Sequence, residues 1–253
     1  MDFLTHAIVF IFGASMGSFL NVVIYRYHSS MSPLNGRSKC FSCGKMLHGY
    51  ELIPIISFLI QLGRCRGCKG KISWQYPIVE LCSGLVWVLV FLLNTSISET
   101  VLLLIIFSIL LIIAVYDMRH QIIPDELVAS FAVLSLIKLL IINHSLLITI
   151  ASGFLFFTLF WSLWFFSNGR LMGLGDGKLV LGIGWFLGLS AGGSALILAF
   201  WIGAAWGIIM LGLQKLGGNL ISRKLSLKSE IPFGPFLILG VFIVYFLKIN
   251  FFA

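Results

Sequence analysis

Charged residues are scarce in this 253-residue chain. They make up 10% of it, and only nine are acidic, whereas a soluble globular domain carries about 25% charged residues. Apolar residues make up 59%, and the mean hydropathy is +1.06. At about 20 apolar residues per membrane span, little of the chain remains for a large extramembrane domain. The composition therefore excludes a soluble enzyme and predicts an all-α polytopic membrane protein.

Uninterrupted apolar runs predict about eight transmembrane helices. They lie at about 3–25, 76–93, 100–116, 126–142, 147–166, 179–189, 193–213 and 232–252. The sixth run is short, so we expect its helix to begin earlier or to be buried among its neighbours. The chain thus divides into a first transmembrane helix (1–25), a loop domain (26–75) and a transmembrane core (76–253). Asp2 stands where a signal peptide carries basic residues, so we interpret the first run as a span.

Basic residues predict the topology. Fifteen of the seventeen Lys and Arg residues fall in loops on one side of the predicted membrane. These loops are 26–75, 117–125, 167–178 and 214–230. The connections on the other side contain none, so the positive-inside rule predicts a cytoplasmic 26–75 loop and both termini on the opposite face. The two exceptions, Lys138 and Lys248, lie near outer ends of spans, and we expect both to snorkel to the interface.

Four cysteines in the basic loop form two C-x2-C pairs separated by 21 residues. The pairs are Cys40 with Cys43 and Cys65 with Cys68. This is a zinc-ribbon spacing one residue beyond the usual window, and four thiolates close a tetrahedral structural site. We expect Gly44 and Gly67 to ease the two turns. The alternative is two disulfides, which a reducing cytoplasm disfavours.

The predicted zinc site is structural, because four thiolates leave no open position for water. Cys82, in the second span, is interpreted as a small buried hydrophobe. A basic zinc ribbon also suits nucleic acid, but the aromatic residues of the loop are not clustered into a stacking platform. We therefore expect no nucleic-acid partner, and membrane lipid as the surroundings of the helices.

Two acidic residues stand at the ends of spans on the predicted cytoplasmic side. Asp117 ends the third span, and Asp176 lies in Gly173-Leu174-Gly175-Asp176-Gly177-Lys178, where the sixth begins. Ionisable residues beside a span are functional candidates. Two converging carboxyl groups share a proton, so that one activates water while the other donates to a substrate carbonyl, as in aspartyl proteases.

Each carboxylate also has a structural alternative. Asp117 can pair with Arg119, and Asp176 can cap the helix that follows it. Asp125 follows Pro124 directly before the fourth span and is predicted to cap that helix. A proton-coupled transporter is a further alternative for the pair, but its carboxylates belong near the membrane midplane rather than at one face.

With these motifs the sequence resembles the type IV prepilin peptidases, bacterial aspartyl leader peptidases of the inner membrane. The resemblance rests on the cysteine tetrad, on Asp117 and on five short segments that follow in order along the chain. The segments are 17–26 (GSFLNVVIYR), 76–80 (YPIVE), 124–125 (PD), 173–178 (GLGDGK) and 231–235 (IPFGP).

The resemblance implies cleavage of the basic leader of type IV prepilins or pseudopilins after a glycine, on the cytoplasmic side, in pilus assembly or type II secretion. It makes Asp117 and Asp176 catalytic, with Gly173, Gly175 and Lys178 as the supporting motif. Peptide cleavage then needs no metal. A presenilin-type Gly-x-Gly-Asp protease is the alternative, although it has no use for the zinc loop.

Members of that family with the long cysteine loop also methylate the new N-terminus with S-adenosylmethionine, which implies the same for this chain. No Gly-x-Gly-x-x-Gly loop marks a site for the methyl donor. Asn21, Arg26 and Glu80, near the cytoplasmic ends of the first two spans, either line that site or act as anchors and interhelical hydrogen bonds.

Overall fold

The computed structural model describes residues 3–27, 32, 36–142, 146–216 and 232–252. Within these ranges the regular structure is helical, and β structure is limited to two isolated bridges. Most of the predicted connection at 143–146 and most of the basic loop at 214–230 lie outside the described residues. The chain divides into two compact units, residues 1–112 and 113–253. The predicted all-α class is confirmed.

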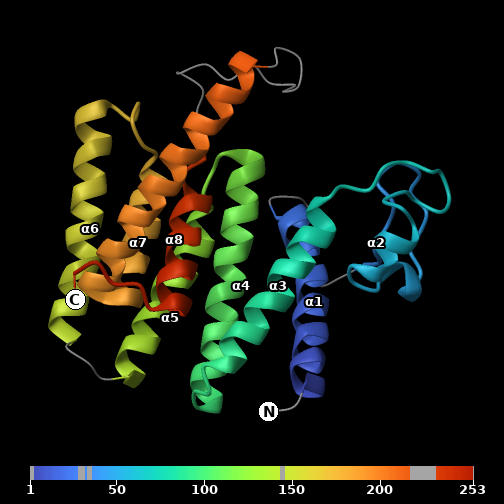
Figure 1. Ribbon diagram of the computed structural model, residues 1–253, viewed down its shortest axis with the longest axis horizontal. Helices are drawn as coiled ribbons and strands as arrows, with labels where there is room; N and C mark the ends of the chain where they lie inside the picture. The colour runs from blue at the N-terminus through green and yellow to red at the C-terminus, as the bar shows by residue number, and fades with distance from the viewer. Residues whose placement is uncertain (1–2, 28–31, 33–35, 143–145, 217–231, 253) are drawn as a thin grey trace. The chain divides into compact units, whose positions relative to one another are not determined.

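The first unit contains a helical hairpin and the loop domain. Its elements are α1 (Phe3–Arg26), η1 (Gly49–Leu52), α2 (Ile56–Ile60), α3 (Gln75–Leu92) and the first part of α4 (Ile97–His120). Helices α1 and α3 pack side by side in opposite directions (Figure 1). Small residues allow this close approach, since a Cβ on Gly17 would lie 2.7 Å from the Glu80 Cα. The Ser83 hydroxyl donates across the pair to the Gly13 carbonyl at 2.7 Å.

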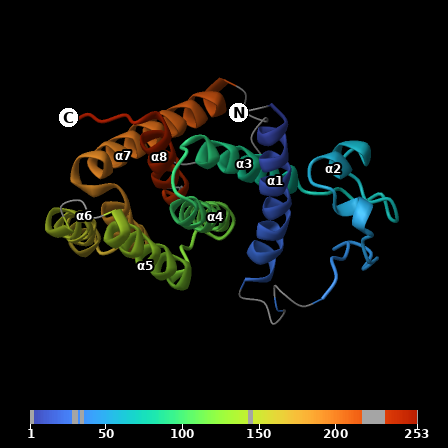
Figure 2. The same ribbon diagram turned by 90° about the horizontal axis from the view of Figure 1, so that it is seen from below.

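The second unit is built around the long helix α7. It contains the end of α4, then α5 (Asp125–Ile142), α6 (Leu146–Ser167), α7 (Leu174–Leu216) and α8 (Gly234–Leu247). Helix α7 packs against α5, α6 and α8, as Figure 2 shows from below. Glycines bring α6 and α7 together, because a Cβ on Gly184 would lie 2.5 Å from the Gly153 Cα.

A break at Gly188 divides α7 into two helices. Gly188 has φ 79° and ψ −173°, a conformation that side chains other than glycine's strongly disfavour. The two halves correspond to the sixth and seventh predicted spans. The first half begins at Leu174 rather than at 179, in agreement with the expectation that the short sixth run begins earlier. Asp176 is therefore inside the helix, in its first turn.

Lys138 does not snorkel as predicted. Its Nζ donates to the Phe186 carbonyl at 3.3 Å and lies 4.2 Å from the Phe186 ring centroid and 5.0 Å from that of Tyr245. A helix leaves its last carbonyls without intrahelical donors. The break after Phe186 thus supplies an acceptor that holds the ammonium group inside the unit.

Five helices are long and apolar enough to cross a membrane: α1, α3, α4, α6 and α7 up to Leu213. Helix α8 is shorter than predicted and ends at Leu247, because the chain beyond it is held by the start of the second half of α7. There the Phe251 amide donates to the Ser194 hydroxyl at 2.9 Å. The chain is a multi-pass membrane protein, and the count of eight spans stays a prediction.

Candidate functional site

The four cysteines of the loop domain form one cluster. Their Sγ atoms all lie within 4.8 Å of one another, and those of Cys40 and Cys68 are 3.8 Å apart. A tetrahedral site with zinc–sulfur bonds of about 2.3 Å places its sulfurs about 3.8 Å apart. All four are free thiols, which favours a metal site over the disulfide alternative. The Cys43 backbone amide donates to Cys40 and lowers the pKa of the Cys40 thiol, which favours the metal-binding thiolate.

Two similar hairpin turns present the thiols. The Cys40 amide donates to the Lys45 carbonyl at 2.9 Å in the first, and the Cys65 amide to the Gly70 carbonyl at 2.9 Å in the second. The residue after each second cysteine is left-handed, Gly44 with φ 70° and Lys69 with φ 59°.

Gly67 lies in the second turn, but its part there differs from that of Gly44. Gly67 has no positive φ, and the left-handed position of its turn belongs to Lys69 instead. Gly67 lies close to the sulfurs: its amide donates to the Cys65 Sγ at 3.4 Å, and a Cβ there would meet the Lys45 side chain at 3.2 Å.

Lys69→Gly is expected to stabilise the metal-bound loop domain. A non-glycine residue in the left-handed region costs about 1–2 kcal/mol, so relief of this strain should raise metal retention about fivefold. Gly44→Ala, which introduces the same strain into the first turn, should lower retention by a similar factor. Competition with a chromophoric chelator measures both variants. Weaker retention by Lys69→Gly would contradict the turn assignment.

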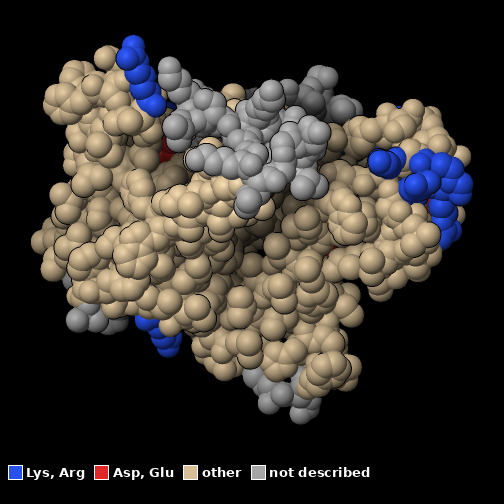
Figure 3. All heavy atoms as spheres, turned by 45° about the horizontal axis from the view of Figure 1, so that its top comes forward, with Lys and Arg blue, Asp and Glu red and all other residues tan. Residues whose placement is uncertain are grey.

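Glu51, the only acid of the loop domain, is buried. Its carboxylate accepts a hydrogen bond from the His48 backbone amide at 3.0 Å and forms an ion pair with the Lys45 Nζ at 3.1 Å. The hydrogen bond from the His48 backbone amide and the ion pair with Lys45 together lower the pKa of Glu51. Exposed Lys and Arg side chains gather on the surface of the loop domain (Figure 3).

The three side chains considered for methyl-donor binding each make a contact within the first unit. The Asn21 Nδ2 donates to the Tyr76 carbonyl at 3.2 Å. The Arg26 Nη1 donates to the Ser32 carbonyl at 2.7 Å, and Glu80 accepts the Ile55 backbone amide at 2.7 Å. These contacts fit structural anchors that join α1, α3 and the loop domain. A part in methyl transfer stays a prediction.

The two candidate carboxylates meet inside the second unit. Asp117, near the end of α4, is 4% exposed, and its Oδ2 accepts the Gly234 amide at 3.1 Å. Asp176, in the first turn of α7, is 8% exposed and hydrogen-bonded by the Gly173 backbone. The two carboxyl groups are close enough to interact electrostatically. The sharing of a proton between them stays a prediction.

Small backbones and one aliphatic side chain shape this site. A Cβ on Gly234 would lie 2.6 Å from the Asp117 Oδ2, and one on Gly173 3.3 Å from the Asp176 Oδ2. The Ile123 side chain is a neighbour of both Gly175 and Gly234, and it therefore borders the site at two points. The sequence alone indicated no role for Gly234 or Ile123. The segment 231–235 contained the only signal for Gly234.

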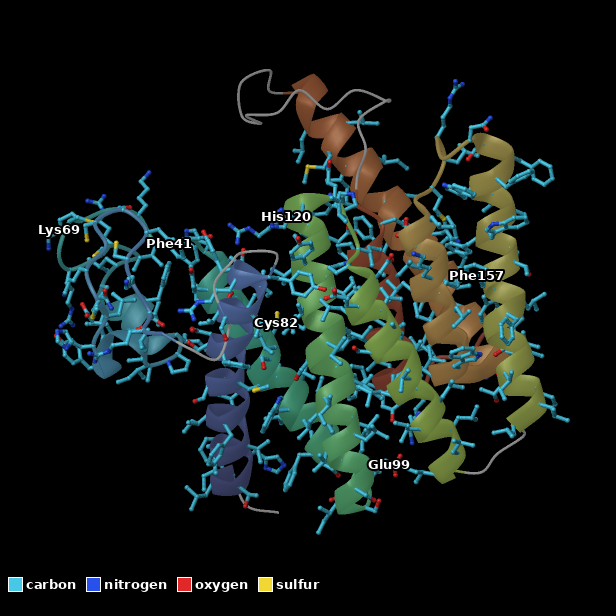
Figure 4. All side chains as sticks on the ribbon, turned by 180° about the vertical axis from the view of Figure 1, so that it is seen from behind. Phe41, Lys69, Cys82, Glu99, His120 and Phe157 are labelled. Carbon is cyan, nitrogen blue, oxygen red and sulfur yellow. The ribbon has the colours of Figure 1, made fainter. Side chains whose placement is uncertain are left out.

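Asp125 and Lys178 form an ion pair of 2.7 Å between the starts of α5 and α7. Asp125 was predicted to cap α5, but it is the first residue of that helix and bonds the lysine instead. Lys178 thus ties together the helices that flank the two buried carboxylates. In Figure 4, His120 marks the end of α4, one turn beyond Asp117.

Fold and site together define a multi-pass membrane protein with two buried, interacting carboxyl groups and a separate cluster of four thiols. Two family models match it: the bacterial Peptidase A24 N-terminal domain over residues 11–94 and the type IV leader peptidase family over residues 104–208. The chain belongs to the type IV leader peptidase family, which supports a role in type IV prepilin processing.

Curated relatives extend over nearly the whole chain. It is 30% identical to a protein of Aeromonas salmonicida strain A449 over 94% of this chain and 89% of the relative. It is 30% identical to one of Bacillus subtilis strain 168, over 94% and 93% respectively. A Myxococcus xanthus protein is 35% identical over 80% of this chain and 62% of its own. All three are named prepilin leader peptidase/N-methyltransferase. No solved structure matches the chain significantly.

Proposed function

We propose that the chain is an aspartyl endopeptidase of the bacterial inner membrane. It removes the basic leader of type IV prepilins or pseudopilins after a glycine, at the cytoplasmic face, and then methylates the new N-terminus. One observation carries this proposal: Asp117 and Asp176 are buried together, and each accepts a backbone amide from a glycine. Family membership favours it over the presenilin-type and transporter alternatives.

In the proposed reaction the two carboxyl groups hold one proton between them. The ionised carboxyl takes a proton from water as the water oxygen attacks the carbonyl carbon of the scissile bond. The protonated carboxyl donates its hydrogen to the carbonyl oxygen. Collapse of the tetrahedral intermediate then breaks the C–N bond, with a proton delivered to the departing amine.

Gly234 and Gly173 orient the two carboxyl groups in this scheme. The Gly234 amide holds one oxygen of Asp117, and the other oxygen stays available for water or substrate. Ile123 packs beside both Gly175 and Gly234 and excludes water from that side of the site. We therefore propose that Gly173 and Gly175 let neighbouring groups approach the backbone closely and help to orient the carboxyl groups.

Charge and topology support the proposed orientation of the substrate. Eight of the seventeen Lys and Arg residues lie in 26–75, which favours a cytoplasmic loop domain and periplasmic termini. The hydrophobic helix of a prepilin enters from the lipid, and its basic leader remains at the anionic cytoplasmic surface. The scissile bond then lies at the interface, where α4 ends and α7 begins.

Methylation and zinc belong to the first unit in this proposal. Cys40, Cys43, Cys65 and Cys68 would hold a structural Zn²⁺, which organises the loop domain without taking part in peptide cleavage. S-adenosylmethionine supplies the methyl group, which passes from its sulfonium to the new amine with loss of one proton. The relatives' name includes N-methyltransferase, which supports this second activity.

Gly234→Ala is expected to lower the rate of cleavage about 100-fold, because its Cβ would lie 2.6 Å from the Asp117 Oδ2 and push that carboxyl out of position. Gly207→Ala is the matched control, since a Cβ there meets nothing within 4 Å. Initial rates on a synthetic prepilin measure both. Full activity of Gly234→Ala would show that Asp117 does not need this geometry.

The proposed function is tested by incubating the purified protein with a prepilin and S-adenosylmethionine and weighing the products. We expect loss of the leader after a glycine, followed by addition of one methyl group to the mature chain. Omission of S-adenosylmethionine should leave cleavage intact. An intact prepilin, or cleavage within its hydrophobic helix, would contradict the proposal.

A further inference from the structure

The short helix α2 presents an apolar face to the surroundings. Ile56, Leu59 and Ile60 are 55%, 60% and 65% exposed, and their spacing places them on one side of the helix. Phe58 turns the other way, is buried, and packs against Trp74 with ring centroids 4.9 Å apart. The loop domain thus has its own small core and leaves the outer side of α2 uncovered.

Residues on either side of α2 extend this face. Ile53 is 45% exposed, and Leu62 is 86% exposed with a left-handed φ of 51°. We name Ile53, Ile56, Leu59, Ile60 and Leu62 the α2 apolar face. Five large apolar side chains exposed within ten residues mark an interaction surface.

The anchoring of the loop domain places this face at a defined depth. The Ile55 amide, directly before α2, donates to the Glu80 carboxylate at 2.7 Å. Glu80 is five residues into α3, about 8 Å along the helix from Gln75. Helix α3 is a candidate membrane span. Figure 1 shows α2 beside the upper part of α1 rather than beyond its end.

Basic side chains accompany the apolar face. The exposed basic residues of the loop domain are Arg37, Lys39, Arg64, Arg66, Lys69 and Lys71. The only acid, Glu51, is buried and bound to Lys45, so it does not offset them at the surface. Lys69 lies at the upper edge of the loop domain in Figure 4, on the side away from α1. An exposed apolar face, accompanied by cations that no exposed acid offsets, matches the acyl chains and anionic headgroups of a leaflet.

We propose that the α2 apolar face is inserted in the membrane as an interfacial anchor, with the basic residues of the loop domain bound to anionic lipid headgroups. Interfacial helices lie about 5–10 Å into the boundary between headgroups and acyl chains, and Glu80 holds Ile55 close to the first turn of a candidate span. The loop domain is then a membrane-bound module whose metal cluster lies at the lipid surface. This inference is independent of the proposed peptidase activity.

Lipid photo-crosslinking tests the anchor in the full-length chain. The protein is placed in nanodiscs of phosphatidylcholine and phosphatidylglycerol that contain a phospholipid with a diazirine in its upper acyl chain, and adducts are mapped by mass spectrometry. We expect adducts within 52–62. Ile60→Glu should lower their yield about tenfold. Met46→Glu, an exposed apolar position of the first cysteine turn, is the matched control and should leave the yield unchanged.

The same experiment tests the contact with anionic headgroups and the alternative that protein covers the α2 apolar face. Nanodiscs of phosphatidylcholine alone should give fewer adducts, since the cations lose their partners, and an unchanged yield would overturn the headgroup contact. Absence of adducts within 52–62 in the unmodified protein would overturn the insertion. If hydroxyl-radical footprinting then finds this segment protected, protein rather than lipid covers it. Equal metal content in all variants shows that the loop domain is folded.

Discussion

Asp117→Asn and Asp176→Asn are each expected to lower the rate of prepilin cleavage by about three orders of magnitude or more. An amide can neither share the proton of the pair nor take one from water. Both side chains are buried and each accepts a glycine amide, which the amide oxygen of Asn can still accept. The variants should therefore insert and accumulate normally. Cleavage rates and protein abundance are measured together in membranes.

Asp125→Asn is the matched control for these variants. It removes the same charge from a nearby acid that is mostly exposed and paired with Lys178. Exposed ion pairs contribute about 0–1 kcal/mol, so we expect near-normal specific activity. Substantial cleavage by well-folded Asp117→Asn or Asp176→Asn would remove that residue from the mechanism. Full inactivity of Asp125→Asn would show that the acid paired with Asp176 is wrongly assigned.

Replacement of any one cluster cysteine by Ser is expected to release the metal and loosen the loop domain. Structural zinc contributes folding free energy of about 10 kcal/mol in small domains, and the four thiolates act as a unit. Elemental analysis should find about one zinc per unmodified chain and almost none in Cys40→Ser or Cys65→Ser. Cys82→Ser is the control, because Cys82 lies in α3 and outside the cluster.

The two activities should respond differently to loss of the metal. Cleavage should survive in part, because Asp117 and Asp176 belong to the second unit and the cluster to the first. Methylation should fall further if the methyl donor binds against the loop domain. A zinc content near zero in the unmodified protein, with the cluster thiols oxidised to disulfides, would overturn both the metal site and the cytoplasmic placement of the loop.

Properties that depend on nearby residues were predictable from the sequence. Apolar runs located the helices, because spanning a bilayer requires a continuous apolar segment. Cys40 and Cys43 form one turn and Cys65 and Cys68 another, so their spacing alone indicated a four-thiol cluster. Asp117 and Asp176 were recognisable as candidates because a carboxylate at the end of an apolar run is rare and costly.

Contacts between distant residues were decided by the tertiary structure. The bond from Gly234 to Asp117 joins residues 117 positions apart, and no periodicity or local motif encodes it. The same holds for Lys138, which we expected at the interface and whose ammonium group bonds the Phe186 carbonyl beside the break at Gly188. Three further contacts depend likewise on how helices pack. They are the pairing of Asp125 with Lys178, the packing of Ile123 beside Gly175 and Gly234, and the bond from Ile55 to Glu80. Hydropathy and turn chemistry act locally, whereas these contacts exist only when separate helices approach one another.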